Sequence, residues 1–207
     1  HRAGHIPGAA MLHVQTPEKS ILLTGDFDTR DSSLVAGAKP VAADILFIEG
    51  TYGGRYHPDK MEETERFLEA VDRVVRRGGT VLIPAFANGR TQDVVMILHK
   101  HRPHLNVHVD GMGKRVAKNH LSHPSFLKDA SGLERAWRWA KKVSSKSDKK
   151  KALGADVIVS TSGMLEGGPA LWYLNRLRHD RKNAVFFTGY QAEGTGGREL
   201  LETSHLN

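Results

Sequence analysis

The sequence of 207 residues contains no cysteine. This absence excludes disulfide bonds and thiolate metal ligands, so a bound metal would have to be held by imidazole and carboxylate groups, which suits a hydrolytic site. The sequence also lacks any apolar run near the about 20 residues that cross a bilayer, and no charged segment leads into a short apolar stretch with a cleavage site. We therefore expect a cytoplasmic protein without membrane contact.

Acidic residues are fewer than basic ones, with 23 Asp and Glu against 30 Lys and Arg, a formal charge of +7 and a pI near 9.7. An excess of basic side chains favours a polyanionic partner, because each cation that neutralises a phosphate releases a condensed counterion, although the same charge also serves solubility. Six lysines lie between Lys141 and Lys151. We expect this run to be a solvated and flexible surface loop.

The first quarter of the chain reads as β-structure. Two apolar stretches, residues 10–14 and 20–24, flank a Pro-Glu-Lys turn and predict a β-hairpin. Residues 44–49 form a continuous apolar run, which is typical of a strand buried on both faces.

From Asp59 onward the pattern alternates between helix and strand. Asp59 is a candidate N-cap with Glu62 three residues later, and Gly78 and Gly79 would end this first helix. Further strands are predicted at 80–83, 106–109, 156–160 and 184–188, and helices at 91–100, from about 114, and at 170–178. Such alternation predicts β-α-β units and a mostly parallel sheet covered by helices, so the fold class is α/β.

Polar and glycine-rich loops follow several of these strands. A parallel sheet binds ligands at the carboxyl ends of its strands, where the amides of a following helix can receive a phosphate. A glycine at such a turn more often serves the backbone conformation of the turn than ligand binding, so a single loop would be weak evidence. Several loops on one sheet edge predict a surface for an RNA backbone, with the candidate residues Arg90, Lys114, Arg115, Thr161, Ser162, Gly163 and Tyr190.

Three residues of the first fifty are candidates for chemistry. His5 follows a glycine and Asp26 lies at the end of the hairpin, on neighbouring loops, but taken alone they also fit a surface residue and a turn residue. Glu49 ends the apolar run, where a buried carboxylate would need a partner or would cap the following turn. Trp137 and Trp139 are two apart in a helix, so one should pack in the core, and we do not predict base stacking by the other.

Six motifs occur in an order that resembles the β-CASP branch of the metallo-β-lactamase superfamily, and in particular its nucleases like the cleavage and polyadenylation factor. They are residues 3–7 (AGHIP), 24–27 (TGDF), 48–53 (IEGTYG), 83–90 (IPAFANGR), 161–164 (TSGM) and 189–191 (GYQ). The resemblance implies part of an αββα metallo-β-lactamase sandwich over residues 1–43. It also implies an inserted β-CASP domain over residues 44–207, with substrate passing between the two.

The resemblance assigns roles to the three candidate residues. His5 resembles a zinc ligand, Asp26 the carboxylate that bridges two zinc ions, and Glu49 the catalytic acid that pairs with a histidine, although Gly50 stands where the family usually has serine. The family's His-x-His-x-Asp-His motif and its two later histidine motifs are absent, and His205 lacks their context. We therefore expect a C-terminally incomplete, inactive part of a longer zinc-dependent ribonuclease.

Two other functions stay open. The chain could belong to a non-catalytic RNA-binding subunit of a processing complex, or to a DNA-repair nuclease of the same superfamily. The TSGM and GYQ motifs favour the RNA branch, with single-stranded RNA as the partner. Homo-oligomers or processing-complex subunits are possible further partners.

Overall fold

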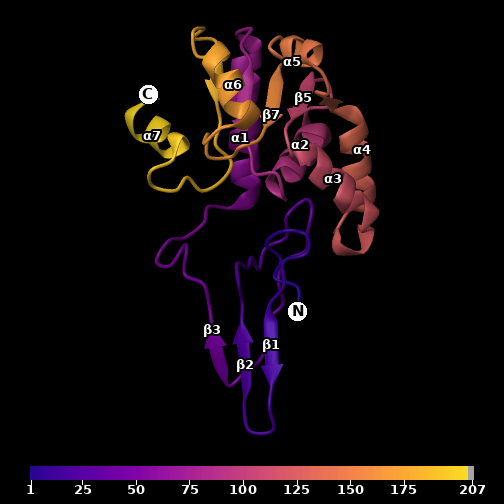
Figure 1. The fold of residues 1–207 in the computed structure, drawn as a ribbon, viewed down its shortest axis with the longest axis vertical. Coiled ribbons are helices and arrows are strands. Elements are labelled where there is room, and N and C mark those ends of the chain that lie inside the picture. Colours follow the sequence, from indigo (N-terminus) through magenta and orange to yellow (C-terminus); the bar gives the residue numbers. More distant parts are fainter. Residues whose placement is uncertain (205–207) are drawn as a thin grey trace.

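The computed structural model describes residues 1–204, which form two β-sheets and a set of helices around the larger sheet. Figure 1 shows the small sheet at one end of the molecule and the larger α/β part at the other. Within the described residues, no helix is long and apolar enough to cross a membrane. His205 lies outside the described residues.

The predicted hairpin is confirmed. Strands β1 (Leu12–Gln15) and β2 (Ser20–Leu23) are antiparallel, and the amide of Thr16 donates to the carbonyl of Lys19 at 2.9 Å to close the turn between them. Strand β3 (Ile45–Phe47) then pairs with β2 in parallel, so the strand expected in the α/β part adds to this first sheet. How the chain divides into domains stays a prediction.

The expectation that residues 44–49 are buried on both faces is wrong. One face of the small sheet contacts a core of Ala3, Met11, Leu22 and Ala38. The opposite face carries side chains that remain between 39% and 61% exposed, namely Leu12, Val14, Leu23, Ile45 and Phe47. Leu46, which pairs with Leu22 on the other face, is also 52% exposed, so β3 has the apolar composition of a strand but is uncovered on both faces among the described residues.

The first long helix forms as its sequence predicts. Helix α1 (Lys60–Arg76) begins at Asp59, whose carboxylate accepts hydrogen bonds from the amides of Met61 and Glu62. Such an N-cap satisfies amide groups that have no partner inside the helix. The chain leaves the helix at Gly78, where φ is +74°, as the glycine pair predicts.

The larger sheet has five parallel strands in the order β6-β5-β7-β4-β8. Parallel strands joined by helices confirm the predicted α/β class. The strands are β4 (Val81–Pro84), β5 (Val107–Asp110), β6 (Lys141–Lys142), β7 (Val157–Ser160) and β8 (Ala184–Val185). The last is shorter than the predicted 184–188.

Helices cover both faces of this sheet (Figure 1). Buried side chains of α1, α2 and α4 form one apolar cluster on the strands, and those of α5 and α6 contribute to a second cluster. The remaining helices are α2 (Arg90–His101), α3 (Gly113–Ser122), the short 3₁₀ helix η1 (Pro124–Phe126), α4 (Ala130–Trp139), α5 (Lys146–Ala152), α6 (Gly168–Leu177) and α7 (Gly196–Thr203).

The lysine-rich run is not the flexible loop that its composition suggests. Lys141 and Lys142 form edge strand β6, and Lys146–Ala152 is helix α5. Ser145 caps this helix by accepting from the amide of Asp148 at 3.0 Å, while the Asp148 carboxylate accepts from the Ser145 amide. This reciprocal capping box starts a helix despite the repulsion among the lysines.

Two adjacent leucines test the exposed face of the small sheet. Leu22 is 4% exposed and Leu23 is 39% exposed, on opposite faces of β2. Leu22→Ala should lower the free energy of unfolding by about 2–4 kcal/mol, whereas Leu23→Ala should cost about 1 kcal/mol or less. Urea denaturation measures both. Equal losses would show that the open face is covered in solution.

Candidate functional site

Three strands of the five-stranded sheet end at the same level. Asp110 of β5 and Pro84 of β4 both pair with Ser160, the last residue of β7. The loops that follow these strands therefore leave the sheet along one shared edge, which we call the carboxyl edge. Parallel α/β sheets bind their ligands at this edge.

Hydrogen bonds connect the loops of the carboxyl edge to one another. The amide of Met112 donates to Thr161 Oγ1 at 3.2 Å, and Gln191 Nε2 donates to the carbonyls of Gly163 at 3.1 Å and Tyr190 at 3.0 Å. The structure thus brings Thr161, Gly163 and Tyr190 together, and Ser162 lies between the first two in the chain. The Tyr190 side chain is 48% exposed.

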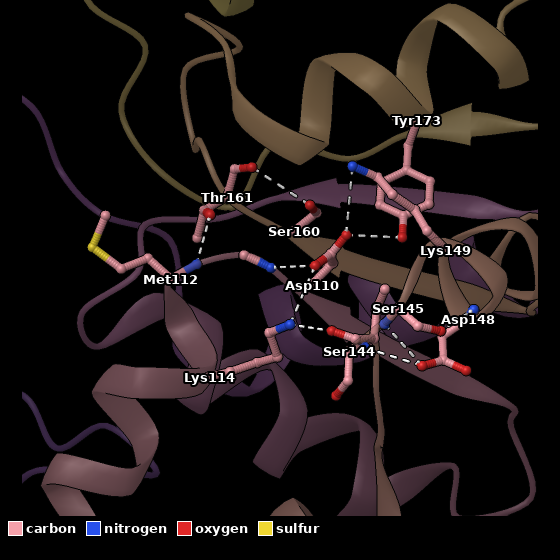
Figure 2. A network of polar contacts seen from close by, with 12 residues as sticks. Asp110, Met112, Lys114, Ser144, Ser145, Asp148, Lys149, Ser160, Thr161 and Tyr173 are labelled. Carbon is pink, nitrogen blue, oxygen red and sulfur yellow. Dashed lines mark hydrogen bonds and ion pairs between the residues drawn. The ribbon is translucent and has the colours of Figure 1, made fainter.

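Beneath these loops lies a buried carboxylate, Asp110 (Figure 2). Its Oδ1 accepts from the Gly111 amide at 2.7 Å and lies 3.4 Å from Lys114 Nζ, and its Oδ2 accepts from the Tyr173 hydroxyl at 3.1 Å. Lys149 Nζ lies 3.9 Å from Oδ2. A buried charge is stable only when it is paired and hydrogen-bonded, and Asp110 meets both conditions.

This network uses residues to which the sequence analysis gave no role. Lys149 comes from the lysine-rich run, and its ammonium group lies 4.6 Å from the ring centroid of Trp172. Tyr173 is fully buried, and its burial, followed by the neighbouring Asp110 charge, strongly raises the pKa of its hydroxyl. Asp110 ends β5 and Lys114 lies in the first turn of α3, so the strand-to-helix turn brings this ion pair together.

The predicted cations differ in how free they are. Lys114 is committed to Asp110 and to the Val143 carbonyl, with which its ammonium group makes a short hydrogen bond. Arg90 is exposed and lies 3.6 Å from the Asp93 carboxylate. Arg115 is exposed and, among the described residues, has no ion pair or side-chain hydrogen bond. Arg115 is therefore the freest of the three for an external anion.

The loops that carry His5, Asp26 and Glu49, the three candidates for chemistry among the first fifty residues, lie next to one another. The Glu49 carboxylate accepts from the Thr51 amide at 2.8 Å. That hydrogen bond, together with the Phe27 amide and the nearby His5, lowers the pKa of the Glu49 carboxyl group against the opposing effect of burial. The Glu49 amide donates to Thr24 Oγ1 at 3.3 Å and the Asp28 amide donates to the Ala3 carbonyl at 2.9 Å, so hydrogen bonds join the loops of all three candidates. The bond to Thr51 is the turn-capping contact that the sequence had left open.

Gly4 sets the position of the His5 loop. Its φ is +71°, and a Cβ at this residue would lie 2.3 Å from the Asp28 carbonyl oxygen and 2.4 Å from the Ala38 amide nitrogen. The neighbouring Ala3 carbonyl accepts from the Asp28 amide at 2.9 Å. Only glycine fits both this backbone conformation and this close approach.

These residues do not form a complete zinc site. Histidine and aspartate are suitable zinc ligands, and His5 and Asp26 are both exposed to solvent. A catalytic zinc requires three protein ligands, however, and residues 1–204 contain no group of three or more His, Asp or Glu side chains placed to hold a metal. The ligands present therefore fit only part of a zinc site.

The N-terminal part contacts the α/β part at several points close to the carboxyl edge. The Ser33 amide donates to the buried Asp93 carboxylate at 2.8 Å, and Lys128 pairs with Asp31 at 2.7 Å. A Cβ at Gly89, in the loop after β4, would lie 2.6 Å from the Ile6 side chain. The His5 loop is thus held against the loop that carries Arg90.

Comparison with known proteins agrees with this architecture. The Beta-Casp domain model matches residues 91–200, which is more than half of the chain. The chain therefore belongs to the β-CASP family of metallo-β-lactamase-type nucleases, as the six motifs predicted.

Curated relatives of the chain come from archaea. It is similar to "Probable RNase MJ4" of Methanocaldococcus jannaschii, 39% identical over 99% of the chain and 50% of the relative, and to "RNase aCSPSF2" of Saccharolobus solfataricus, 36% identical over 98% and 42%. It is also 35% identical to "Transcription termination factor FttA" of M. jannaschii, over 97% of the chain and 35% of the relative. The chain spans half or less of the length of these relatives.

Two glycines of the same N-terminal segment test how the His5 loop is held. Gly4→Ala combines a left-handed backbone with a clash against Asp28, so it should lower the free energy of unfolding by about 3 kcal/mol. Gly8 has a φ of +88° but no atom within 4 Å of a Cβ, so Gly8→Ala should cost only about 1 kcal/mol. Thermal denaturation compares them, and similar losses would contradict the close approach at Gly4.

A matched pair of tyrosines tests the Asp110 network. Tyr173→Phe removes the hydroxyl donor to a buried carboxylate and should cost about 1.5 kcal/mol of stability, because hydrogen bonds to charged groups are the stronger ones. Tyr190→Phe alters an exposed hydroxyl and should change stability by less than about 0.5 kcal/mol. Urea denaturation measures the difference, and a neutral Tyr173→Phe would mean that the hydrogen bond adds nothing to stability.

Proposed function

We propose that the whole protein, meaning this chain together with any further segments that its gene encodes, hydrolyses phosphodiester bonds of single-stranded RNA with zinc. The observation that carries the proposal is that hydrogen bonds join the His5, Asp26 and Glu49 loops, and that Ile6, next to His5, lies against Gly89 at the carboxyl edge. The relatives named as RNases support RNA as the substrate. The 207-residue chain alone is proposed to be inactive, because its described residues supply no complete set of metal ligands.

Within this proposal each group has a role. His5 and Asp26 contribute two ligands to a zinc site that is completed by groups outside residues 1–204. When bound, zinc would activate a water molecule and neutralise phosphate oxygens. Glu49 would orient a proton donor from its half-buried position beside the turn. The loops of the carboxyl edge would hold the RNA backbone through amides and through Arg90 and Arg115.

The alternative function is an RNA-binding subunit without catalysis. It is favoured by one observation, namely that the described residues do not form a metal site. Both functions require RNA binding, so binding alone does not separate them. The two functions are separated by measuring whether the whole protein hydrolyses RNA and whether that hydrolysis depends on Asp26.

The decisive substitution is Asp26→Asn in the whole protein. It should reduce RNA hydrolysis by at least about 100-fold, because a ligand to the metals is lost, while RNA affinity stays the same. Asp180→Asn, on the exposed turn before β8, is the control and should change neither. Gel assays with and without chelator measure cleavage, and filter binding measures affinity.

Two results would contradict the proposal. If Asp26→Asn retains turnover within a few-fold of the parent, Asp26 is only a turn residue. If the unaltered whole protein binds RNA but shows no chelator-sensitive cleavage, the binding-subunit alternative holds. The 207-residue chain, assayed in parallel, should show no such cleavage.

A further inference from the structure

A basic groove lies beside the carboxyl edge, along the outer side of edge strand β6. Its cavity volume is about 720 Å³, and helix α3, the end of α4 and the residues after β6 line it. The lining side chains used below are Lys114, Arg115, Lys118, Trp137, Lys142 and Ser144. No acidic side chain is among the described residues that line the groove, so its charge is uniformly positive.

Two cations of the groove are available to an external anion. Arg115 and Lys118 lie three apart on α3, are exposed, and have no ion pair or side-chain hydrogen bond among the residues that the structure describes. Side chains at this spacing point to the same side of a helix. By contrast, Lys114 and Lys142 are held by internal contacts and serve to shape the groove.

The groove also contains the indole ring of Trp137, whose nitrogen has no hydrogen-bond partner among residues 1–204. Trp137 lines the cavity, and Lys142 Nζ fixes the backbone behind it by donating to the carbonyls of Trp137 at 2.6 Å and Ala140 at 2.8 Å. Its neighbour Trp139 differs, because its indole nitrogen donates to the Pro103 carbonyl at 2.9 Å. Both rings are half-buried and pack against the main apolar cluster, but of the two only Trp137 also lines the groove.

The groove is continuous with the Asp110 network. Lys114 lines the groove and pairs with Asp110, and Lys149 of the lysine-rich run pairs with the same carboxylate. The loops of the carboxyl edge and the lysine-rich run therefore meet at Asp110. A polyanion that lies on the carboxyl edge could extend directly into the groove.

We propose that this groove is a second binding site for single-stranded RNA, in which Arg115 and Lys118 contact phosphates and Trp137 stacks on an unpaired base. The proposal rests on the proposed function, because it takes RNA to be the polyanion. An aromatic ring beside a row of cations is the arrangement by which proteins bind single strands without sequence preference. An acidic peptide would satisfy the cations but would leave the indole without a stacking partner.

The test measures binding of a fluorescently labelled oligouridine to the 207-residue chain, with chelator present and over a range of salt concentrations. The combined variant Arg115→Ala and Lys118→Ala should lower affinity about tenfold and reduce the magnitude of the salt slope by about 1.4, since each phosphate contact in single strands contributes about 0.7. Trp137→Leu should lower affinity about tenfold without changing the salt slope, because stacking releases no counterions.

The control removes the same charge elsewhere. Arg76 ends helix α1 and Arg181 precedes β8, so both lie where strands of the sheet begin, opposite the carboxyl edge. Arg76→Ala combined with Arg181→Ala should leave the affinity and the salt slope nearly unchanged. All variants are exposed or half-buried at the altered positions, and thermal denaturation confirms that they fold.

Several results would overturn the groove as an RNA site. If the groove variants and the control variant lower the RNA affinity equally, binding depends only on the general surface charge of the chain. The groove would be a site for acidic chains if two results came together: Trp137→Leu leaves the RNA affinity unchanged, and polyglutamate of matched charge displaces the RNA. Failure of the groove leaves hydrolysis by the whole protein and its loss in Asp26→Asn unaffected, so the two proposals are tested separately. If the chain binds no RNA at all, the groove proposal is wrong.

Discussion

The buried carboxylate of Asp110 is the interaction on which the arrangement of the carboxyl edge depends. It ends the second strand of the sheet, and it brings together groups from α3, α5 and α6. Because an isolated charge in a low-dielectric interior is strongly unfavourable, each of these segments must remain close enough to donate or to balance the charge. The same contact that stabilises the sheet edge therefore determines where Lys149 lies and where Lys114, one of the residues that line the basic groove, lies.

Much of the α/β part could be predicted because local signals there agree with the global fold. The Asp59 cap, the apolar strands and the glycines at their ends all act over a few residues, so they can be read from the sequence. The shared carboxyl edge followed from the parallel topology alone. Local signals could not identify the family, but the order of the motifs did. The roles proposed for His5, Asp26 and Glu49 follow from that family resemblance.

The errors arose where a partner distant in sequence decides the outcome. Residues 45–47 have the composition of a buried strand, but one face of their sheet has no cover within the described residues. The lysine-rich run has the composition of a solvated loop, but the Ser145 cap, the Asp110 carboxylate and the Trp172 ring give it structure and contacts. Tyr173 and Asp110 are 63 residues apart, so no local pattern could pair them.

Contacts between the two parts of the chain explain how a site could be shared across them. Ser33 and Asp31 hold the N-terminal segment against α2 and the start of α4, and Ile6 lies against Gly89 at the carboxyl edge. These contacts keep the His5 loop beside the loop of Arg90, whereas the basic groove lies at the other end of the same edge, next to β6. Helix α3 connects the two places, because its first residue, Gly113, accepts from Gln92 Nε2 at 2.9 Å while its Arg115 and Lys118 line the groove. A strand that leaves the groove along α3 would therefore reach the loop after β4, where the exposed Arg90 adds a cation to the amides and hydroxyls of the carboxyl edge.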